Sequence, residues 1–121
     1  MAGVSTINEK DKIIIFTDLA NLTGEDALSV MSEAVDVISQ YQPKSVFSLV
    51  DMTGMRFNKI VIEKVTEVAR MNEPYVKVTA IVGLNSVAKL IAKSVIKLTG
   101  RNTVLFDQIE EAKNWLIDES N

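Results

Sequence analysis

The sequence contains neither cysteine nor histidine. Without cysteine the fold cannot depend on disulfides, and neither thiolate chemistry nor a cysteine-based metal site is available. Without histidine the chain lacks the commonest general base near neutral pH, the commonest transition-metal ligand and every Ser-His nucleophile pair. Only carboxylates, hydroxyls and lysines remain for chemistry. We therefore expect no enzyme activity, no metal site and no cofactor.

Proline and glycine are also scarce, at two and five residues, so no linker or low-complexity segment divides the chain. No stretch approaches the roughly 20 apolar residues of a membrane span, and residues 1–12 lack a signal-peptide pattern. These absences predict a cytoplasmic protein without a membrane span. The length of 121 residues and 47% apolar content predict one folded domain over residues 1–121. A net charge of -3 gives no overall attraction to nucleic acid.

Short β-rich runs alternate with longer segments of helical periodicity. The runs cover residues 13–16, 45–50, 76–82 and 103–106, and helices are expected from Thr23 to Pro43, over about 58–72, from Asn85 or Ser86 to Thr99, and from Asp107 onward. This alternation with short connections predicts an α/β fold, a (βα)4 unit with a four-stranded, mainly parallel sheet. Residues 1–11 are expected to form a short N-terminal segment or a weak edge strand.

The stretch Leu49–Phe57 resembles the strand-to-loop signature of STAS domains, the fold shared by anti-sigma-factor antagonists and transporter cytoplasmic domains. The pattern from Ala80 to Leu116 is similar to the SpoIIAA-like branch, often labelled STAS/Sec14-like. The resemblance runs from about Ile13 to Leu116 and implies a SpoIIAA-like fold with a regulatory, protein-binding role. Signalling members carry a phosphorylated Ser or Thr at the start of the second helix. Here residues 58–62 offer no hydroxyl, so the usual phosphoacceptor is missing.

Two sets of polar residues follow predicted strands, at the sheet edge where open α/β folds usually bind ligands. Asp18 and Asp51 could form a carboxylate pair that binds a cation or acts as acid and base, but capping of the following turns is the favoured interpretation. Asn85 and Ser86 follow Gly83 at a helix start, where an anion could bind. A single glycine without the P-loop spacing favours simple helix capping there too.

A basic ridge runs along the third predicted helix, where Lys89, Lys93 and Lys97 recur every four residues and Arg101 follows. Residues 76–106 hold five basic residues and no acid, whereas residues 13–43 hold five acids and no base. The simpler interpretation is a solvated face, and the alternative is a site for an anionic partner. The same helix carries more apolar residues than one packed stripe needs. The surplus, Ala92 and Ile96, indicates contact with a neighbouring helix, another subunit or a lipid surface.

These observations leave two hypotheses for function. The first is a regulatory protein-interaction domain, binding a protein partner or forming a homodimer, as the resemblance implies. The second is a carrier or sensor of a small amphipathic ligand, such as an anionic lipid or a nucleotide, on the Sec14-like analogy. The residues expected to bind the partner or ligand are Asn85, Ser86, Lys89, Lys93, Lys97 and Arg101.

Overall fold

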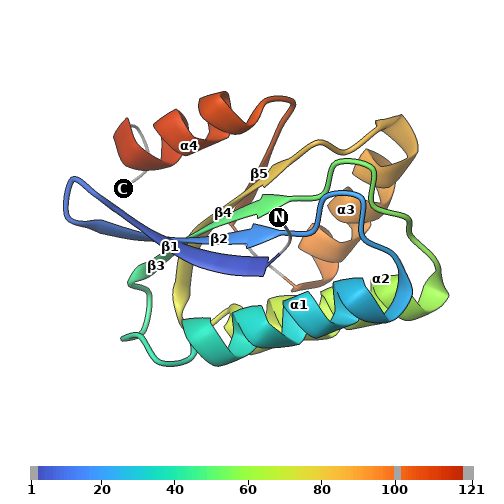
Figure 1. The fold of residues 1–121 in the computed structure, drawn as a ribbon, viewed down its shortest axis with the longest axis horizontal. Coiled ribbons are helices and arrows are strands. Elements are labelled where there is room, and N and C mark those ends of the chain that lie inside the picture. The colour runs from blue at the N-terminus through green and yellow to red at the C-terminus, as the bar shows by residue number, and fades with distance from the viewer. Residues whose placement is uncertain (1–2, 100–101, 119–121) are drawn as a thin grey trace.

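The computed structural model describes residues 3–99 and 102–118, which form a five-stranded sheet in the order β1-β2-β3-β4-β5. Helices α1, α2 and α3 lie on one face of the sheet and α4 lies on the other (Figure 1). The elements are β1 (Gly3–Glu9), β2 (Lys12–Asp18), α1 (Gly24–Ile38), β3 (Val46–Asp51), α2 (Lys59–Asn72), β4 (Val76–Val82), α3 (Ser86–Thr99), β5 (Thr103–Phe106) and α4 (Ile109–Asp118). The predicted (βα)4 unit is confirmed, since β2 to β5 are parallel and a helix follows each of them.

The sheet has one strand more than the predicted four. β1 pairs antiparallel with β2 over its whole length, from Gly3 opposite Asp18 to Glu9 opposite Lys12. The connecting residues Lys10 and Asp11 both have positive φ, at 47° and 65°, which fits the tight hairpin turn that matches strand twist. The polar composition of β1 suits an edge strand, because charged and polar side chains discourage pairing with other chains.

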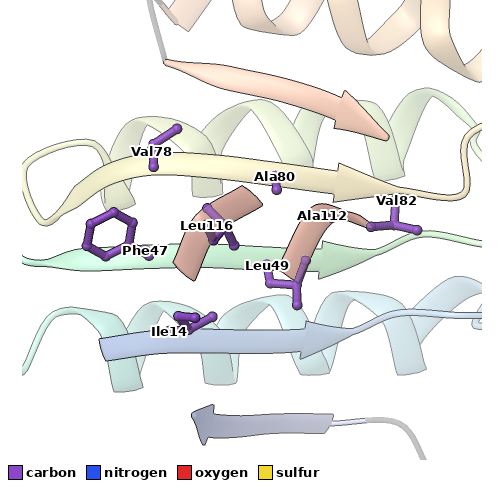
Figure 2. Packing of buried hydrophobic residues seen from close by; sticks show 8 residues of the cluster. All are labelled: Ile14, Phe47, Leu49, Val78, Ala80, Val82, Ala112 and Leu116. Carbon is purple, nitrogen blue, oxygen red and sulfur yellow. The ribbon is translucent and has the colours of Figure 1, made fainter. Parts of the chain in front are cut away.

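Both faces of the central strands are buried. Beneath α4, Leu116 and Ala112 pack on a cluster of sheet residues shown in Figure 2. That cluster consists of Ile14, Phe47, Leu49, Val78, Ala80 and Val82. On the other face, Met31 and Ala27 of α1, Val61 of α2 and Ala88 of α3 belong to a second cluster. None of the helices in the described segments is long and apolar enough to cross a membrane.

Two lysines of the β1–β2 hairpin contact the carboxyl end of α4. The Lys12 ammonium donates hydrogen bonds to the carbonyls of Leu116 at 2.8 Å and Ile117 at 2.9 Å, and it lies 5.0 Å from the centre of the Phe47 ring. Lys10 pairs with Asp118, and this hydrogen bond and charge raise the pKa of Lys10. The last carbonyls of a helix have no partner inside it, and Lys12 supplies donors to two of them in α4.

We expect Lys12→Met to lower the free energy of unfolding by about 1–2 kcal/mol, because two partly buried carbonyls lose a charged donor while the aliphatic stem is kept. Urea denaturation measures this. The matched control is Lys10→Met, which removes only an exposed ion pair and should have a much smaller effect. Equal effects of the two substitutions would contradict a specific role for Lys12.

Candidate functional site

The two carboxylates at the carboxyl edge of the sheet, Asp18 and Asp51, form hydrogen bonds within the turns that follow them. Asp18 and Asp51 are register partners at the ends of β2 and β3. The Oδ1 atom of Asp18 accepts a hydrogen bond from the backbone N–H of Ala20 at 3.0 Å. That of Asp51 accepts from the backbone N–H of Thr53 at 2.9 Å and from its hydroxyl at 2.7 Å. Turn capping therefore accounts for both residues, and the described chain holds no cluster of three metal-binding side chains.

The loops after β2, β3 and β4 pack directly on one another at this edge. Gly54 has a φ of +69°, and a Cβ there would lie 2.2 Å from Asn21 Oδ1. Gly83 has a φ of +88°, and a Cβ there would lie 1.9 Å from Thr53 Oγ1. Gly83 needs glycine both for its positive φ and because the backbone of Thr53 lies so close. At Gly54 the positive φ is the main reason, since the Asn21 amide can move aside. The contacts tie the start of α3 to the loop that follows β3.

The start of α3 uses Asn85 as a helix cap. Its Oδ1 atom accepts the backbone N–H of Ala88 at 2.8 Å, which satisfies one of the free donors of the first turn. Ser86 is the first residue of the helix and is exposed. The capping interpretation therefore explains the Asn85 side chain, and its oxygen is already occupied by its own helix.

The lysines of the predicted basic ridge differ in their surroundings. Lys89 forms a 3.0 Å ion pair with Asp107, which lies between β5 and α4, so its charge is compensated from another element. Lys93 and Lys97 are exposed and make no ion pair with any residue in the described ranges. Arg101 lies outside the described residues. The surface available to an anionic partner on α3 is thus centred on Lys93 and Lys97.

Apolar side chains point to solvent beside these lysines. Val87, Leu90 and Leu98 are 69%, 68% and 68% exposed. Their spacing of three and eight residues places them along one side of the helix. The predicted surplus residues, Ala92 and Ile96, are instead partly buried and line a cavity inside the molecule. Of the three contacts predicted for Ala92 and Ile96, the neighbouring helix fits this position, because α2 lines the same cavity. The exposed apolar residues Val87, Leu90 and Leu98 were not singled out from the sequence.

That cavity lies between the sheet and the layer of α1, α2 and α3, and has a volume of about 100 Å³. Among the residues that the structure describes, its walls are mainly apolar and include no charged side chain. Polar atoms come from hydroxyl residues of the strands and from Asn72, the last residue of α2. None of these residues was singled out from the sequence. The available signal was the presence of Ser48, Thr79 and Thr103 within otherwise apolar strands.

A solved structure from Shewanella loihica PV-4, described as an uncharacterized protein from the DUF3478 family with a SpoIIAA-like fold, matches this chain with a TM-score of 0.66. The match covers 96% of this chain and 95% of that one. This chain has a SpoIIAA-like fold. Because the two sequences are 14% identical, the likeness shows the fold alone. No protein-family model matches the sequence, and no curated protein matches it.

Within this SpoIIAA-like fold, the start of α2 is the position at which the STAS resemblance implies a phosphoacceptor in signalling members. Here Asn58 stands before the helix, and its Oδ1 accepts the backbone N–H of Val61 at 2.8 Å. The side chain thus caps α2 and offers no hydroxyl for modification. The predicted departure from the signalling pattern therefore has a structural role in this chain.

Proposed function

We propose that the chain is a non-enzymatic regulatory domain that binds protein through the exposed side of α3, and that the partner is a second copy of the chain. One observation carries the proposal. Val87, Leu90 and Leu98 are each about two-thirds exposed on a helix whose inner side, at Ala88 and Val95, is buried. Scattered exposed apolar residues are ordinary, but several along one side of one helix are typical of an interaction surface.

Charge complementarity supports a second copy as the partner. Lys93 and Lys97 flank the apolar residues of α3 and are exposed. The exposed acids of α1 are Glu25, Asp26, Glu33 and Asp36. A two-fold dimer can place α3 of each protomer against α1 of the other, so that each contact is made twice. Such a dimer should weaken with salt, because exposed charges are screened over about 8 Å at physiological ionic strength.

The absence of enzyme activity is part of this proposal. The chain has no histidine or cysteine, and the carboxylates of Asp18 and Asp51 bind their own turns. A general base would have to be a carboxylate already committed to its own turn, or an acid or a lysine on the surface. We therefore place the function in recognition, with the SpoIIAA-like fold as a rigid support for α3.

The test is charge reversal on α3. We expect Lys93→Glu/Lys97→Glu to weaken self-association about tenfold, because two favourable contacts become repulsive at each of two symmetric sites. Sedimentation velocity over a concentration series measures this. The free energy of unfolding should stay within about ±0.5 kcal/mol per substitution, because both side chains are exposed. The matched control is Lys59→Glu/Lys113→Glu, which changes the net charge equally but lies on α2 and α4.

A second variant tests the assigned partner surface. Glu33→Lys/Asp36→Lys should weaken association like the α3 reversal, and a chain carrying both reversals should associate again. Rescue would identify α1 as the surface that α3 contacts. Two results would contradict the proposal: a wild-type protein that stays monomeric throughout the series, or association that the α3 reversal leaves unchanged. If the monomer instead binds anionic vesicles through Lys93 and Lys97, the partner is a lipid surface and not a second copy.

A further inference from the structure

Three hydroxyl side chains form a row across the face of the sheet that α1, α2 and α3 cover. Ser48 of β3 is the register partner of Thr79 in β4, and Thr79 is the partner of Thr103 in β5. All three residues line the cavity beneath α1, α2 and α3. Ser48 and Thr79 are each only 4% exposed. Interior strand positions are usually apolar, so a polar row at one level of the sheet gives this cavity a distinct polar wall.

Asn72 provides the decisive observation. It ends α2, is 6% exposed and lines the same cavity. Its Oδ1 atom has no hydrogen-bond partner among the described protein groups. A buried acceptor without a donor costs free energy, and such atoms are few in folded proteins. Asn72 therefore brings to the lining of the cavity a buried acceptor that no described protein group satisfies.

The rest of the lining limits the kind of ligand that could donate a hydrogen bond to Asn72 Oδ1. They are contributed largely by aliphatic side chains, including Val65 of α2 and Ala92 and Val95 of α3. No charged residue stands among the described residues of the lining, so an ionised ligand would lose its hydration there without compensation. The volume of about 100 Å³ is several times what one water needs, and it is of the order of the ~150 Å³ apolar cavity that accommodates benzene.

We propose that this cavity binds a small uncharged molecule of about one ring, mainly apolar, whose single hydroxyl or N–H donates a hydrogen bond to Asn72 Oδ1. The apolar body of the ligand packs between α2, α3 and the sheet. Ile91, Ile96 and Thr103 of the lining are partly exposed, so this part of the lining is the least covered by protein. The proposal does not rest on self-association, because the residues involved lie on the inner side of α3.

Phenol, toluene and benzoate are suitable probes, since they share a ring and differ in having a donor, no polar group or a charge. We would titrate each into protein labelled at its alanine methyl groups and record carbon–proton correlation spectra. Phenol should shift the methyls of Ala69 and Ala92, which line the cavity, in a saturable way. The methyl of Ala112, under α4 on the opposite face, should not move. Benzoate should leave all three unchanged.

The variant Asn72→Ala tests the hydrogen bond. It should weaken phenol binding about fivefold relative to toluene, the loss expected for one neutral hydrogen bond. The matched control is Asn114→Ala, an exposed asparagine of α4 that should change neither affinity. Ala92→Leu fills the cavity from α3 while keeping Asn72, and it should abolish binding of both probes. This second variant keeps the test valid if Asn72→Ala does not fold.

Three results would overturn the proposal. The first is the absence of saturable shifts with both phenol and toluene, which would mean that the cavity takes up water only. The second is an equal effect of Asn72→Ala on phenol and toluene, which would mean that the amide oxygen does not recognise the donor. The third is unchanged phenol binding in Ala92→Leu, which would place phenol outside this cavity.

Discussion

Gly83→Ala is expected to lower the free energy of unfolding by about 2–5 kcal/mol, as measured by urea denaturation. Two costs add at this position. A φ of +88° is strained for an L-residue, which costs roughly 1–2 kcal/mol. The added Cβ would also lie 1.9 Å from Thr53 Oγ1 and 2.8 Å from Thr53 Cα. A rotamer change can move the hydroxyl but not the Cα, so the loop after β3 must shift, at a further ~1–3 kcal/mol.

Gly24→Ala is the matched control for this prediction. Gly24 also has a positive φ, +54°, but its Cβ would meet no atom within 4 Å. This variant should therefore show the conformational cost alone, about 1 kcal/mol. Equal losses in the two variants would contradict close packing of the loops at the carboxyl edge. A larger loss for Gly83→Ala would show that this packing holds the start of α3.

Leu116→Ala is expected to cost about 3 kcal/mol of unfolding free energy, within the range of 2–5 kcal/mol for leucine truncation in a core. Leu116 of α4 is 0% exposed, and its side chain packs on the central strands (Figure 2). The truncation leaves a void next to Ile14 and Leu49, which the sheet backbone cannot close. Thermal and urea unfolding both measure the loss.

The control for Leu116→Ala is Ile60→Ala. Ile60 is a comparably large aliphatic residue on α2 but is 66% exposed, so its truncation should change stability by less than about 0.5 kcal/mol. A loss below about 1 kcal/mol for Leu116→Ala would mean that α4 is not an integral layer of the fold.

Local patterns identified the repeating units with useful precision. The predicted strands at 76–82 and 103–106 coincide with β4 and β5, because apolar β-rich runs bounded by turn residues are a local signal. The ends of α1 were less well predicted. Thr23 is the N-cap but makes no side-chain hydrogen bond, and the helix ends at Ile38, well before Pro43. A proline marks where a helix cannot continue, and the chain can leave the helix earlier.

Residues 3–9 form the strand β1 because they pair with β2. Its residues have little local strand signal, and only pairing with the strongly apolar β2 through a two-residue turn makes them a strand. The same holds for the charges. Lys89 is compensated by Asp107, 18 residues away, which no helical spacing could indicate. Distances along the sequence predict neighbours within a helix, but contacts between elements depend on how those elements pack.

The sequence by itself therefore determined the α/β class, the order of the βα units and the absence of histidine and cysteine chemistry. Only the tertiary structure decided which apolar residues of α3 face outward, because the sheet and α2 select the buried side. The tertiary structure also decided which residues line the cavity. Ser48, Thr79 and Thr103 are far apart along the chain and lie in one row only through the register of β3, β4 and β5. Register and helix orientation arise from contacts between distant segments, which periodicity within a segment does not encode.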